Sequence, residues 1–482
     1  MQLVWQPVWR GCALLLALAA CGGDDGGKPR DATPDAAAPD PNEGLRSGTR
    51  LHLQWHAYGE TRAFAGLFDS QRNESCNATR WADGNTYCTP AAANVVYTDA
   101  GCTLPIAQVA HVAGCTDVAP TYLLAGAVAG CTSQPAHLYM AGAKITAVPY
   151  YQKDPTTGMC SGPNTPSVNF FYYGSGAEVA ATDLAGLTRA ASDDAGRIKR
   201  QFLTSADGAK IFDLPHDSML DLDCAPTVTS DSTAGTCAPA GAVAANFFHD
   251  NACTQGELTT LAECPKPGYA SQAVHPECTS SALHYFAVGD PATAPPLYLA
   301  VGCSSTTAPG DSAFYLLGQS LATMSLTRAA DTTTGRTVQL IHYSDGTSQV
   351  RDSVLYDTQH MTECNETTAA DGSVRCLPVR GNLVSLFSDV SCMTPVDVAR
   401  VDVMPATCTA LPVPKFVFKN LPPVPGTCGN GLSIYDVGAP YTGPLYQGGS
   451  CTAVDTTAAQ YYALGTAHTV DEFPLATPAQ DP

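Results

Sequence analysis

The chain has 482 residues, and its 24 lysines and arginines against 44 aspartates and glutamates give a formal net charge of −20 at pH 7. A surface this acidic argues against nucleic acid or anionic lipid headgroups as partners. Charged residues make up only 14% of the chain, a low share that is typical of exported, β-rich proteins.

Residues 1–20 are predicted to be a lipoprotein signal peptide. A short leader with Arg10 precedes the apolar run from Ala13 to Ala17, which is too short to span a bilayer as a permanent helix. The segment from Leu18 to Cys21 then resembles a bacterial lipobox. This resemblance implies that Cys21 is acylated and becomes the mature first residue. The alternative is an ordinary secretory signal that has a chance cysteine at its end.

Residues 21–47 are predicted to form a disordered, acidic tether. They are mainly Gly, Asp, Pro and Ala, and such a segment cannot bury enough apolar surface to offset its chain entropy. Gly22, directly after the lipobox, is compatible with sorting to the outer membrane. We therefore expect a protein that is lipid-anchored in the outer membrane, on its periplasmic or its outer face.

Three internal repeats follow, predicted at residues 48–190, 191–329 and 330–476, with a loose polar tail at 477–482. The first two open with Gly48-Thr49-Arg50 and Gly196-Arg197, and we expect Gly335-Arg336 to open the third. No Pro-rich linker and no shift in composition separates the copies. The copies are therefore expected to be parts of one continuous architecture.

Eighteen cysteines lie in the repeats, six in each, and an even number per unit in an exported chain predicts a disulfide framework. The close Cys-x2-4-Cys pairs of zinc sites are missing from the sequence. An Asp-Gly turn between the first two cysteines favours a first-to-second pairing across a hairpin. Third-to-fourth and fifth-to-sixth pairings would follow by default. The predicted disulfide cysteines are Cys76, Cys88, Cys102, Cys115, Cys131, Cys160, Cys224, Cys237, Cys253, Cys264, Cys278, Cys303, Cys364, Cys376, Cys392, Cys408, Cys428 and Cys451.

Short alternating stretches fill each repeat and predict an all-β fold. They are rich in β-branched or aromatic residues and are ended by Gly, Pro, Asn or Asp. About eight strands per repeat, about twenty-four in all, fit a six-bladed β-propeller with two four-stranded blades per repeat. Three tandem disulfide-rich β-sandwich domains are the alternative architecture. Examples of the predicted strands are residues 51–58, 92–97, 136–140, 168–173, 297–301 and 338–343.

Two aspartates recur in every copy, one before the first cysteine and one before the third. If the repeats surround an axis, each set would form a ring of carboxylates that suits a cation such as Ca²⁺, the one cofactor candidate. The alternative is an Asx turn, in which each aspartate binds its own backbone two residues on. The two sets are Asp69, Asp217 and Asp357, and Asp99, Asp250 and Asp389.

Aromatic residues cluster in the first repeat and are the predicted ligand-binding residues. Trp55, Trp81, and the pairs that begin with Tyr150 and Tyr172 could act as stacking platforms for sugars. The alternative is that these rings fill the faces of the strands. The sequence holds neither a His-Glu-x-x-His motif nor a Gly-x-Ser-x-Gly motif, and we predict no catalytic residue.

The lipobox, the acidic tether and the Cys-rich β repeats together resemble uncharacterised exported bacterial lipoproteins, a group with no known activity to transfer. The predicted function is non-enzymatic: a lipid-anchored envelope protein that presents a rigid, disulfide-stapled β surface to a glycan or to another envelope protein. The alternative is a hydrolase or lyase that acts on extracellular polymers at the mouth of the propeller channel. A third possibility is a structural envelope component without a ligand. A local function is expected where the three copies differ.

Overall fold

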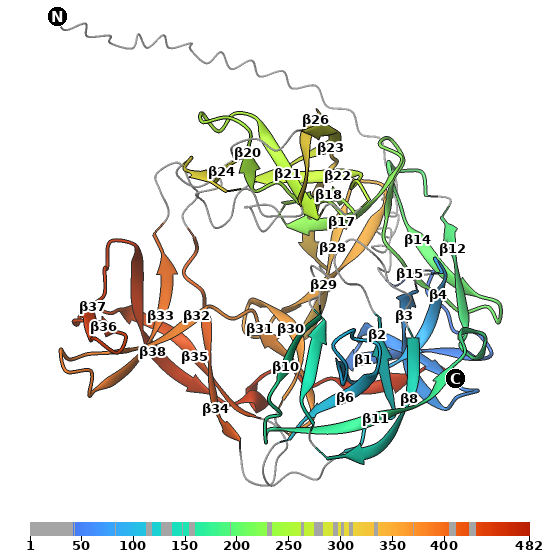
Figure 1. The fold of residues 1–482 in the computed structure, drawn as a ribbon, viewed down its shortest axis with the longest axis horizontal. Coiled ribbons are helices and arrows are strands. Elements are labelled where there is room, and N and C mark those ends of the chain that lie inside the picture. The colour runs from blue at the N-terminus through green and yellow to red at the C-terminus, as the bar shows by residue number, and fades with distance from the viewer. Residues whose placement is uncertain are drawn as a thin grey trace, which may run out of the picture. The chain divides into compact units, whose positions relative to one another are not determined.

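The computed structural model is built from strands and two short 3₁₀ turns, η1 (Ala181–Asp183) and η2 (Val470–Glu472), which confirms the all-β prediction (Figure 1). None of the described helical segments is long and apolar enough to cross a membrane. The structure describes residues 42, 44–81, 83–111, 118–126, 137–146, 148–153, 160–192, 194–228, 234–261, 265–273, 283–292, 297–299, 303–307, 312–331, 336–369, 371–403, 411–423 and 430–482.

The first half of every repeat contributes to two long antiparallel sheets that the repeats share. One is eight-stranded, in the order β15 (Lys210–Phe212), β14 (Gln201–Ser205), β12 (Gly186–Ala191), β4 (Thr86–Pro90), β3 (Glu74–Arg80), β2 (Thr61–Asp69), β1 (Leu51–Tyr58) and β39 (Thr477–Gln480). The other is nine-stranded, in the order β13 (Ile198–Lys199), β16 (His216–Asp217), β17 (Leu222–Val228), β18 (Ala234–Pro239), β27 (Ser325–Ala330), β28 (Val338–Ser344), β29 (Gln349–Asp357), β30 (Thr362–Thr368) and β31 (Val374–Pro378).

Strand pairing joins each repeat to the next one. β12 of the first repeat pairs with β14 of the second, and β27 of the second pairs with β28 of the third. At the end of the chain, Leu475 bridges to Arg375 of β31, and β39 pairs with β1. The expectation of a loose tail at residues 477–482 is therefore wrong. This polar segment instead forms backbone hydrogen bonds with β1, the first strand of the chain.

The opening hairpins of the repeats also hold one another. The tip of the hairpin in one copy bonds to the backbone at the start of the first strand in another copy, and this happens three times in cyclic order. Each bond satisfies a polar backbone group that the sheet itself leaves free. The bonds run from the Leu51 N–H to Asp207 (2.9 Å), from the Ile198 N–H to Asp345 (3.1 Å), and from the Thr61 hydroxyl to the Val338 carbonyl (2.5 Å).

The second half of each repeat forms a sheet of its own, in which seven strands have the same order in all three copies and repeat two adds an eighth strand, β19, at one edge. In repeat one the order is β10 (Cys160–Asn164), β9 (Tyr150–Lys153), β5 (Asn94–Tyr97), β6 (Pro105–Ala110), β11 (Phe170–Val179), β8 (His137–Ile145) and β7 (Tyr122–Ala125). In repeat two it is β25 (Ser305–Thr306), β24 (Leu297–Leu299), β20 (Phe247–Phe248), β21 (Gly256–Leu261), β26 (Ser312–Ser320), β23 (Leu283–Ala292), β22 (Tyr269–Ala273) and β19 (Val243–Ala244). In repeat three it is β37 (Thr452–Ala453), β36 (Tyr446–Gln447), β32 (Asn382–Phe387), β33 (Pro395–Asp402), β38 (Ala459–His468), β35 (Asn430–Pro440) and β34 (Phe416–Pro423).

These sheets do not have the four-stranded blades of a propeller, because the described strands form sheets of seven to nine. They do not form three separate sandwiches either, since β12 and β27 each pair with strands of two repeats. Each repeat instead has one half that joins its neighbours and one half that forms its own sheet. The prediction of about eight strands per repeat is too low, because short strands of two or three residues bring the described chain to 39 strands.

Six disulfides lie in the described residues and indicate an oxidising, extracellular environment. The first-to-second pairing is confirmed in all three repeats, by Cys76–Cys88, Cys224–Cys237 and Cys364–Cys376. The third-to-fourth and fifth-to-sixth pairings are wrong. The third cysteine bonds the sixth, in Cys102–Cys160, Cys253–Cys303 and Cys392–Cys451. The reason is that β9 pairs with β5, β24 with β20 and β36 with β32, which brings the sixth cysteine beside the loop that carries the third. Cys115, Cys131, Cys264, Cys278, Cys408 and Cys428 lie outside the described residues.

Candidate functional site

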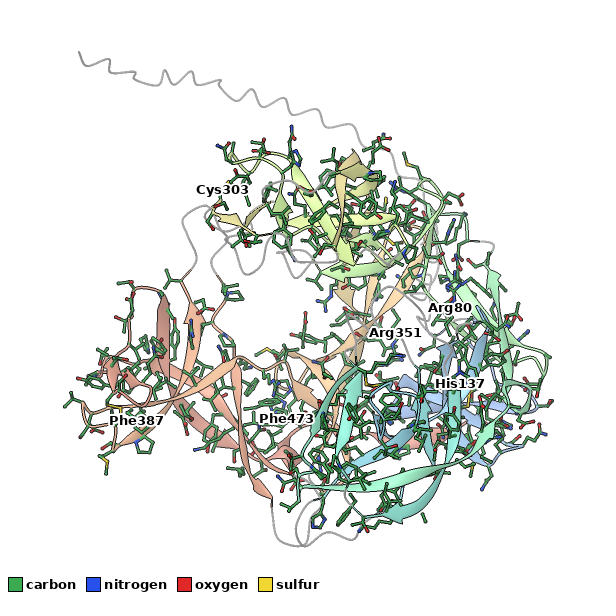
Figure 2. All side chains as sticks on the ribbon, in the orientation of Figure 1. Arg80, His137, Cys303, Arg351, Phe387 and Phe473 are labelled. Atoms are coloured by element: carbon green, nitrogen blue, oxygen red, sulfur yellow. A yellow bond between two sulfur atoms is a disulfide. The ribbon has the colours of Figure 1, made fainter. Side chains whose placement is uncertain are left out.

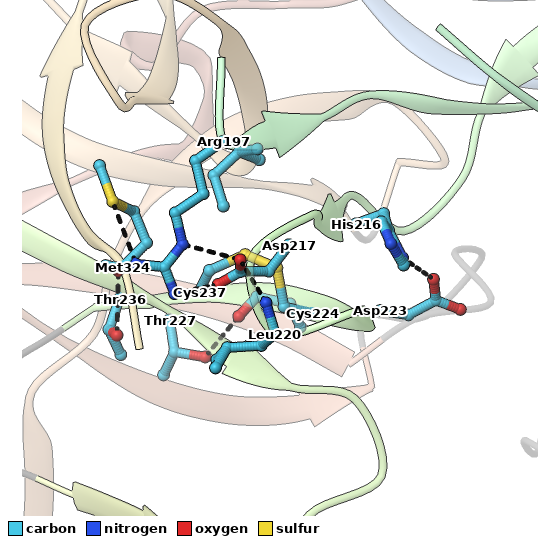
Figure 3. The surroundings of a disulfide bond; sticks show 12 residues. Arg197, His216, Asp217, Leu220, Asp223, Cys224, Thr227, Thr236, Cys237 and Met324 are labelled. Atoms are coloured by element: carbon cyan, nitrogen blue, oxygen red, sulfur yellow. Dashed lines mark hydrogen bonds and ion pairs between the residues drawn. A yellow bond between two sulfur atoms is a disulfide. The ribbon is translucent and has the colours of Figure 1, made fainter. Parts of the chain in front are cut away.

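The first set of repeated aspartates is buried and has a structural role. In repeat two, Asp217 is fully buried, and its two carboxylate oxygens accept hydrogen bonds from Arg197 at 2.7 and 2.6 Å, next to the Cys224–Cys237 disulfide (Figure 3). Its Oδ1 also accepts the backbone N–H of Met219. With its charge balanced and its lone pairs occupied, this carboxylate is not available to a cation.

Repeat one repeats this arrangement and repeat three changes it. Arg50 binds Asp69 through its Nε and one terminal nitrogen, at 2.9 and 2.7 Å. In repeat three the carboxylate of Asp357 instead lies 2.6 Å from Nδ1 of His360. The expectation that Arg336 takes the opening position is wrong, since the backbone hydrogen bonds place Thr337 at the position of Arg50.

The second set of repeated aspartates forms Asx-type turns, as the alternative interpretation predicts. Each carboxylate caps the loop around the third cysteine by accepting backbone N–H groups two to five residues further on. The Leu104 N–H is the largest of the contacts that hold the pKa of Asp99 below its ordinary value. The closing bonds run from Leu104 to Asp99 (2.7 Å), from Gln255 to Asp250 (2.6 Å) and from Thr394 to Asp389 (2.6 Å).

Most of the predicted stacking residues lie inside the protein. Trp55 is 5% exposed, with the Arg62 guanidinium 4.4 Å from its ring centre, and Tyr172 is 1% exposed. Tyr150 is half-buried and packs against Tyr172, with their ring centres 5.8 Å apart. These positions favour the alternative interpretation, in which the rings fill the core. Sugar stacking on these rings stays an untested prediction.

The fourth predicted residue, Trp81, fills a space between the two halves of repeat one. It is 8% exposed, its Nε1 donates to the Thr89 hydroxyl at 3.1 Å, and its ring contacts Tyr87 edge-on at 5.2 Å. It packs in a cluster with Tyr122 and Leu138 of the second-half sheet. The indole therefore joins the shared sheet to the sheet that belongs to repeat one alone.

Repeat three has Ala369 where repeat one has Trp81. Both residues lie five positions after the first cysteine of their copy. Each carbonyl accepts the glycine N–H of the Asp-Gly turn, at 3.0 Å from Gly84 in repeat one and 2.9 Å from Gly372 in repeat three. The side chains that surround the position also correspond between the copies: Tyr122 with Phe416, Leu138 with Ile434, and Leu184 with Phe473.

A pocket borders Ala369, and we call it the repeat-three pocket. Its volume is about 510 Å³, and Ala369 is one of its walls. Its apolar surface comes from the Leu377, Pro378, Phe418 and Leu432 side chains of β31, β34 and β35. The pocket therefore lies between the shared sheet and the sheet of repeat three, beside the position that Trp81 occupies in repeat one.

Uncharged polar groups and one cation complete the wall of this pocket. Asn365 and Asn420 are exposed, and their side-chain amides make no hydrogen bond to the described residues. The same holds for the guanidinium of Arg380, while the hydroxyls of Thr367 and Thr368 lie in the same wall. An amide offers two donors and an acceptor, so these groups are free to bind hydroxyls of a ligand. Apolar walls with a few polar groups are the usual composition of a small-molecule site.

Two histidines lie in the aromatic cluster next to the repeat-three pocket. The ring of His360 is 4.5 Å from that of Phe473, and Nδ1 of His468 is 2.8 Å from Glu472. Hydrogen bonding to Glu472, aided by Asp436 and opposed by partial burial, raises the pKa of His468 above its ordinary value. Among the residues that the structure covers, no group of three or more His, Cys, Asp and Glu side chains is arranged to hold a metal ion.

Comparisons with known proteins give the chain a family but no activity. A family of unknown function, DUF7481, matches residues 14–473. No curated protein and no solved structure matches the chain. Its function therefore has to be inferred from its own geometry.

Proposed function

The chain belongs to the family of unknown function DUF7481, and from the geometry of its third repeat we propose a binding protein of the cell envelope that holds a glycan ring in the repeat-three pocket without converting it. The observation that carries this proposal is the exchange of Trp81 for Ala369, because the copy with the smaller side chain has a pocket beside this position. The rest of the chain is then the rigid, disulfide-stapled support for that position.

A sugar ring fits this pocket better than a charged ligand does. Its apolar C–H face can lie on Phe418 and Leu432, while its hydroxyls meet the free amides of Asn365 and Asn420. Among the described residues, the lining includes one cation, Arg380, and no carboxylate. Because the protein as a whole is strongly acidic, a neutral ligand also avoids long-range repulsion.

The envelope location of the proposal depends on Cys21, which lies outside the described residues. In a bacterial expression host, the protein should incorporate labelled fatty acid and sediment with the membrane fraction. Cys21→Ser should abolish the labelling and release the folded protein, because in this proposal Cys21 is the residue that carries the fatty acids. Labelling that persists in Cys21→Ser would rule out a lipid anchor at this position.

Closing the pocket is the test of the binding function. We expect the neutral sugars glucose, galactose, mannose or N-acetylglucosamine, or their short oligomers, to show saturation-transfer NMR signals with the purified protein. Ala369→Trp should weaken that binding more than twentyfold, because the indole would occupy the cavity as Trp81 does in repeat one. Thermal stability should be unchanged or higher, since the substitution fills a space rather than overfilling a core.

Two further variants make the result decisive. Ala91→Trp adds the same side chain at an exposed position after β4 and should leave binding unchanged. Asn420→Ala removes one free amide from the exposed wall and should weaken binding about tenfold, the value of one good hydrogen bond of about 1.4 kcal/mol. If none of the tested sugars gave a binding signal, the glycan proposal would be overturned. If Ala369→Trp bound the sugars as well as the unaltered protein does, the repeat-three pocket would be excluded as the site.

A further inference from the structure

A second pocket lies where equivalent positions of the three opening hairpins meet. Strand pairing aligns Phe64 with Trp55 in repeat one, Phe212 with Phe202 in repeat two, and Arg351 with His342 in repeat three. Phe64, Phe212 and Arg351 are therefore the same position of the three copies. All three line one cavity of about 390 Å³, which we call the three-repeat pocket.

Repeat three breaks the symmetry of this pocket by placing a cation where the other copies place a phenyl ring. The remaining apolar surface comes from Leu214, Pro215, Pro226 and Val350. The described lining thus combines two aromatic side chains and an aliphatic surface with the guanidinium of Arg351 and that of Arg200, which is already bound to Asp194. This is the composition of a site for a ligand with one apolar part and one polar end.

The carboxylates in the wall are already occupied by partners. Asp213 accepts a hydrogen bond from Nε of Arg189 at 2.5 Å. Asp352 accepts one from Nε of the almost fully buried Arg328 at 2.8 Å. A third carboxylate, Glu366, has its own pair of partners from repeat one. Its Oε1 accepts the Tyr58 hydroxyl at 3.1 Å and lies 3.0 Å from Nδ1 of His56.

Among the described charged side chains of this wall, Arg351 has no hydrogen-bond or ion-pair partner. Its guanidinium (Arg351 is labelled in Figure 2) makes no hydrogen bond or ion pair to any described residue, and its Nε is buried from solvent. Burial lowers the pKa of this guanidinium from its ordinary value, against the attraction of Glu366 and Asp352. A buried donor without an acceptor costs about 1–3 kcal/mol, and a bound ligand that supplied an acceptor would recover that free energy.

We propose that the three-repeat pocket binds a small monocarboxylate with an aromatic or aliphatic body, its carboxylate on Arg351 and its body against Phe64 and Phe212. A carboxylate matches the fork of donors that a guanidinium presents, and it can bind through two parallel hydrogen bonds. Ligands with several negative charges are disfavoured, because Asp213, Asp352 and Glu366 share the wall.

This second site does not depend on the repeat-three pocket, and Ala369→Trp leaves it open. The probes are phenylacetate and hexanoate, each compared with its own primary amide, by calorimetry and saturation-transfer NMR on the purified protein. We expect one molecule of either carboxylate to bind per chain and the amides to bind at least tenfold more weakly. Equal binding of acids and amides would overturn the role of charge in the proposal.

Substitutions at one position separate binding from folding. Arg351→Met should weaken carboxylate binding at least tenfold while the unfolding midpoint stays the same or rises, because the replaced group has no hydrogen-bond or ion-pair partner among the described residues. Arg351→Lys should retain part of the affinity, since it keeps the charge and loses the fork of donors. Arg80→Met, at an exposed position on β3, is the matched control and should bind as the unaltered protein does (Figure 2). Carboxylate binding that survives in Arg351→Met would overturn the proposal.

Discussion

Replacing Arg197 by methionine is expected to lower the free energy of unfolding by about 3–5 kcal/mol, because it leaves a buried charge without its partner. Asp217 is fully buried, and Arg197 donates to both of its oxygens. The same guanidinium also donates to the carbonyl of Ala322 at 2.7 Å, so its loss unpairs a backbone group as well. Urea unfolding of the oxidised protein, followed by circular dichroism, measures the change.

Two comparisons separate this effect from a general loss of surface charge. Arg189→Met removes an arginine that is 40% exposed and bonds Asp213, and an ion pair of that kind contributes only about 0–1 kcal/mol. The double variant Arg197→Met with Asp217→Asn should be more stable than Arg197→Met alone, because the buried charge is then gone. If Arg189→Met and Arg197→Met lowered the free energy of unfolding by similar amounts, the unpaired buried charge of Asp217 would not be the origin of the effect.

The features that depend on neighbouring residues could be predicted from the sequence. Alternation predicted the strand at residues 51–58, which β1 matches, and the Asp-Gly turn predicted the hairpin that Cys76–Cys88 closes. The pairing of Cys102 with Cys160 could not be predicted, since it depends on how a whole sheet folds between them. The shared sheets were missed for the same reason: spacing along the chain does not reveal which strands of different copies are neighbours.

Both candidate pockets lie where the copies differ, as the sequence led us to expect, but neither was located from the sequence. Aligning the copies on their first cysteines would have placed Ala369 opposite Trp81, and that exchange of a large for a small side chain is a visible signal. Instead, Trp81 was selected because aromatic residues cluster in repeat one. Arg351 gave no comparable signal. In repeat three, the pairing of β28 with β29 skips residues between Leu340 and His342. Counting along the chain therefore does not reveal that Arg351 is at the position equivalent to Phe64 and Phe212.

Removing the disulfide between Cys102 and Cys160 should destabilise the protein more than removing the one between Cys76 and Cys88. The first bond joins residues 58 apart, and the second joins residues 12 apart. In the chain-entropy model these loops correspond to about 4.2 and about 2.8 kcal/mol, because the longer loop restricts the unfolded chain more. Paired substitutions, Cys102→Ala with Cys160→Ala and Cys76→Ala with Cys88→Ala, allow the two losses to be compared in guanidinium unfolding without reductant.

Packing acts in the opposite direction and makes the comparison informative. Cys76 and Cys88 are both buried in the core cluster of repeat one, whereas Cys160 is half-buried at the edge of its sheet. If lost packing outweighed loop closure, the Cys76–Cys88 variant would be the less stable one. The equivalent pairs Cys364–Cys376 and Cys392–Cys451 have separations of 12 and 59 residues and provide an independent repetition. The loop-closure explanation requires that, in both repeats, removing the disulfide of the longer loop lowers the free energy of unfolding more. A larger decrease for the shorter loop in either repeat would refute this explanation.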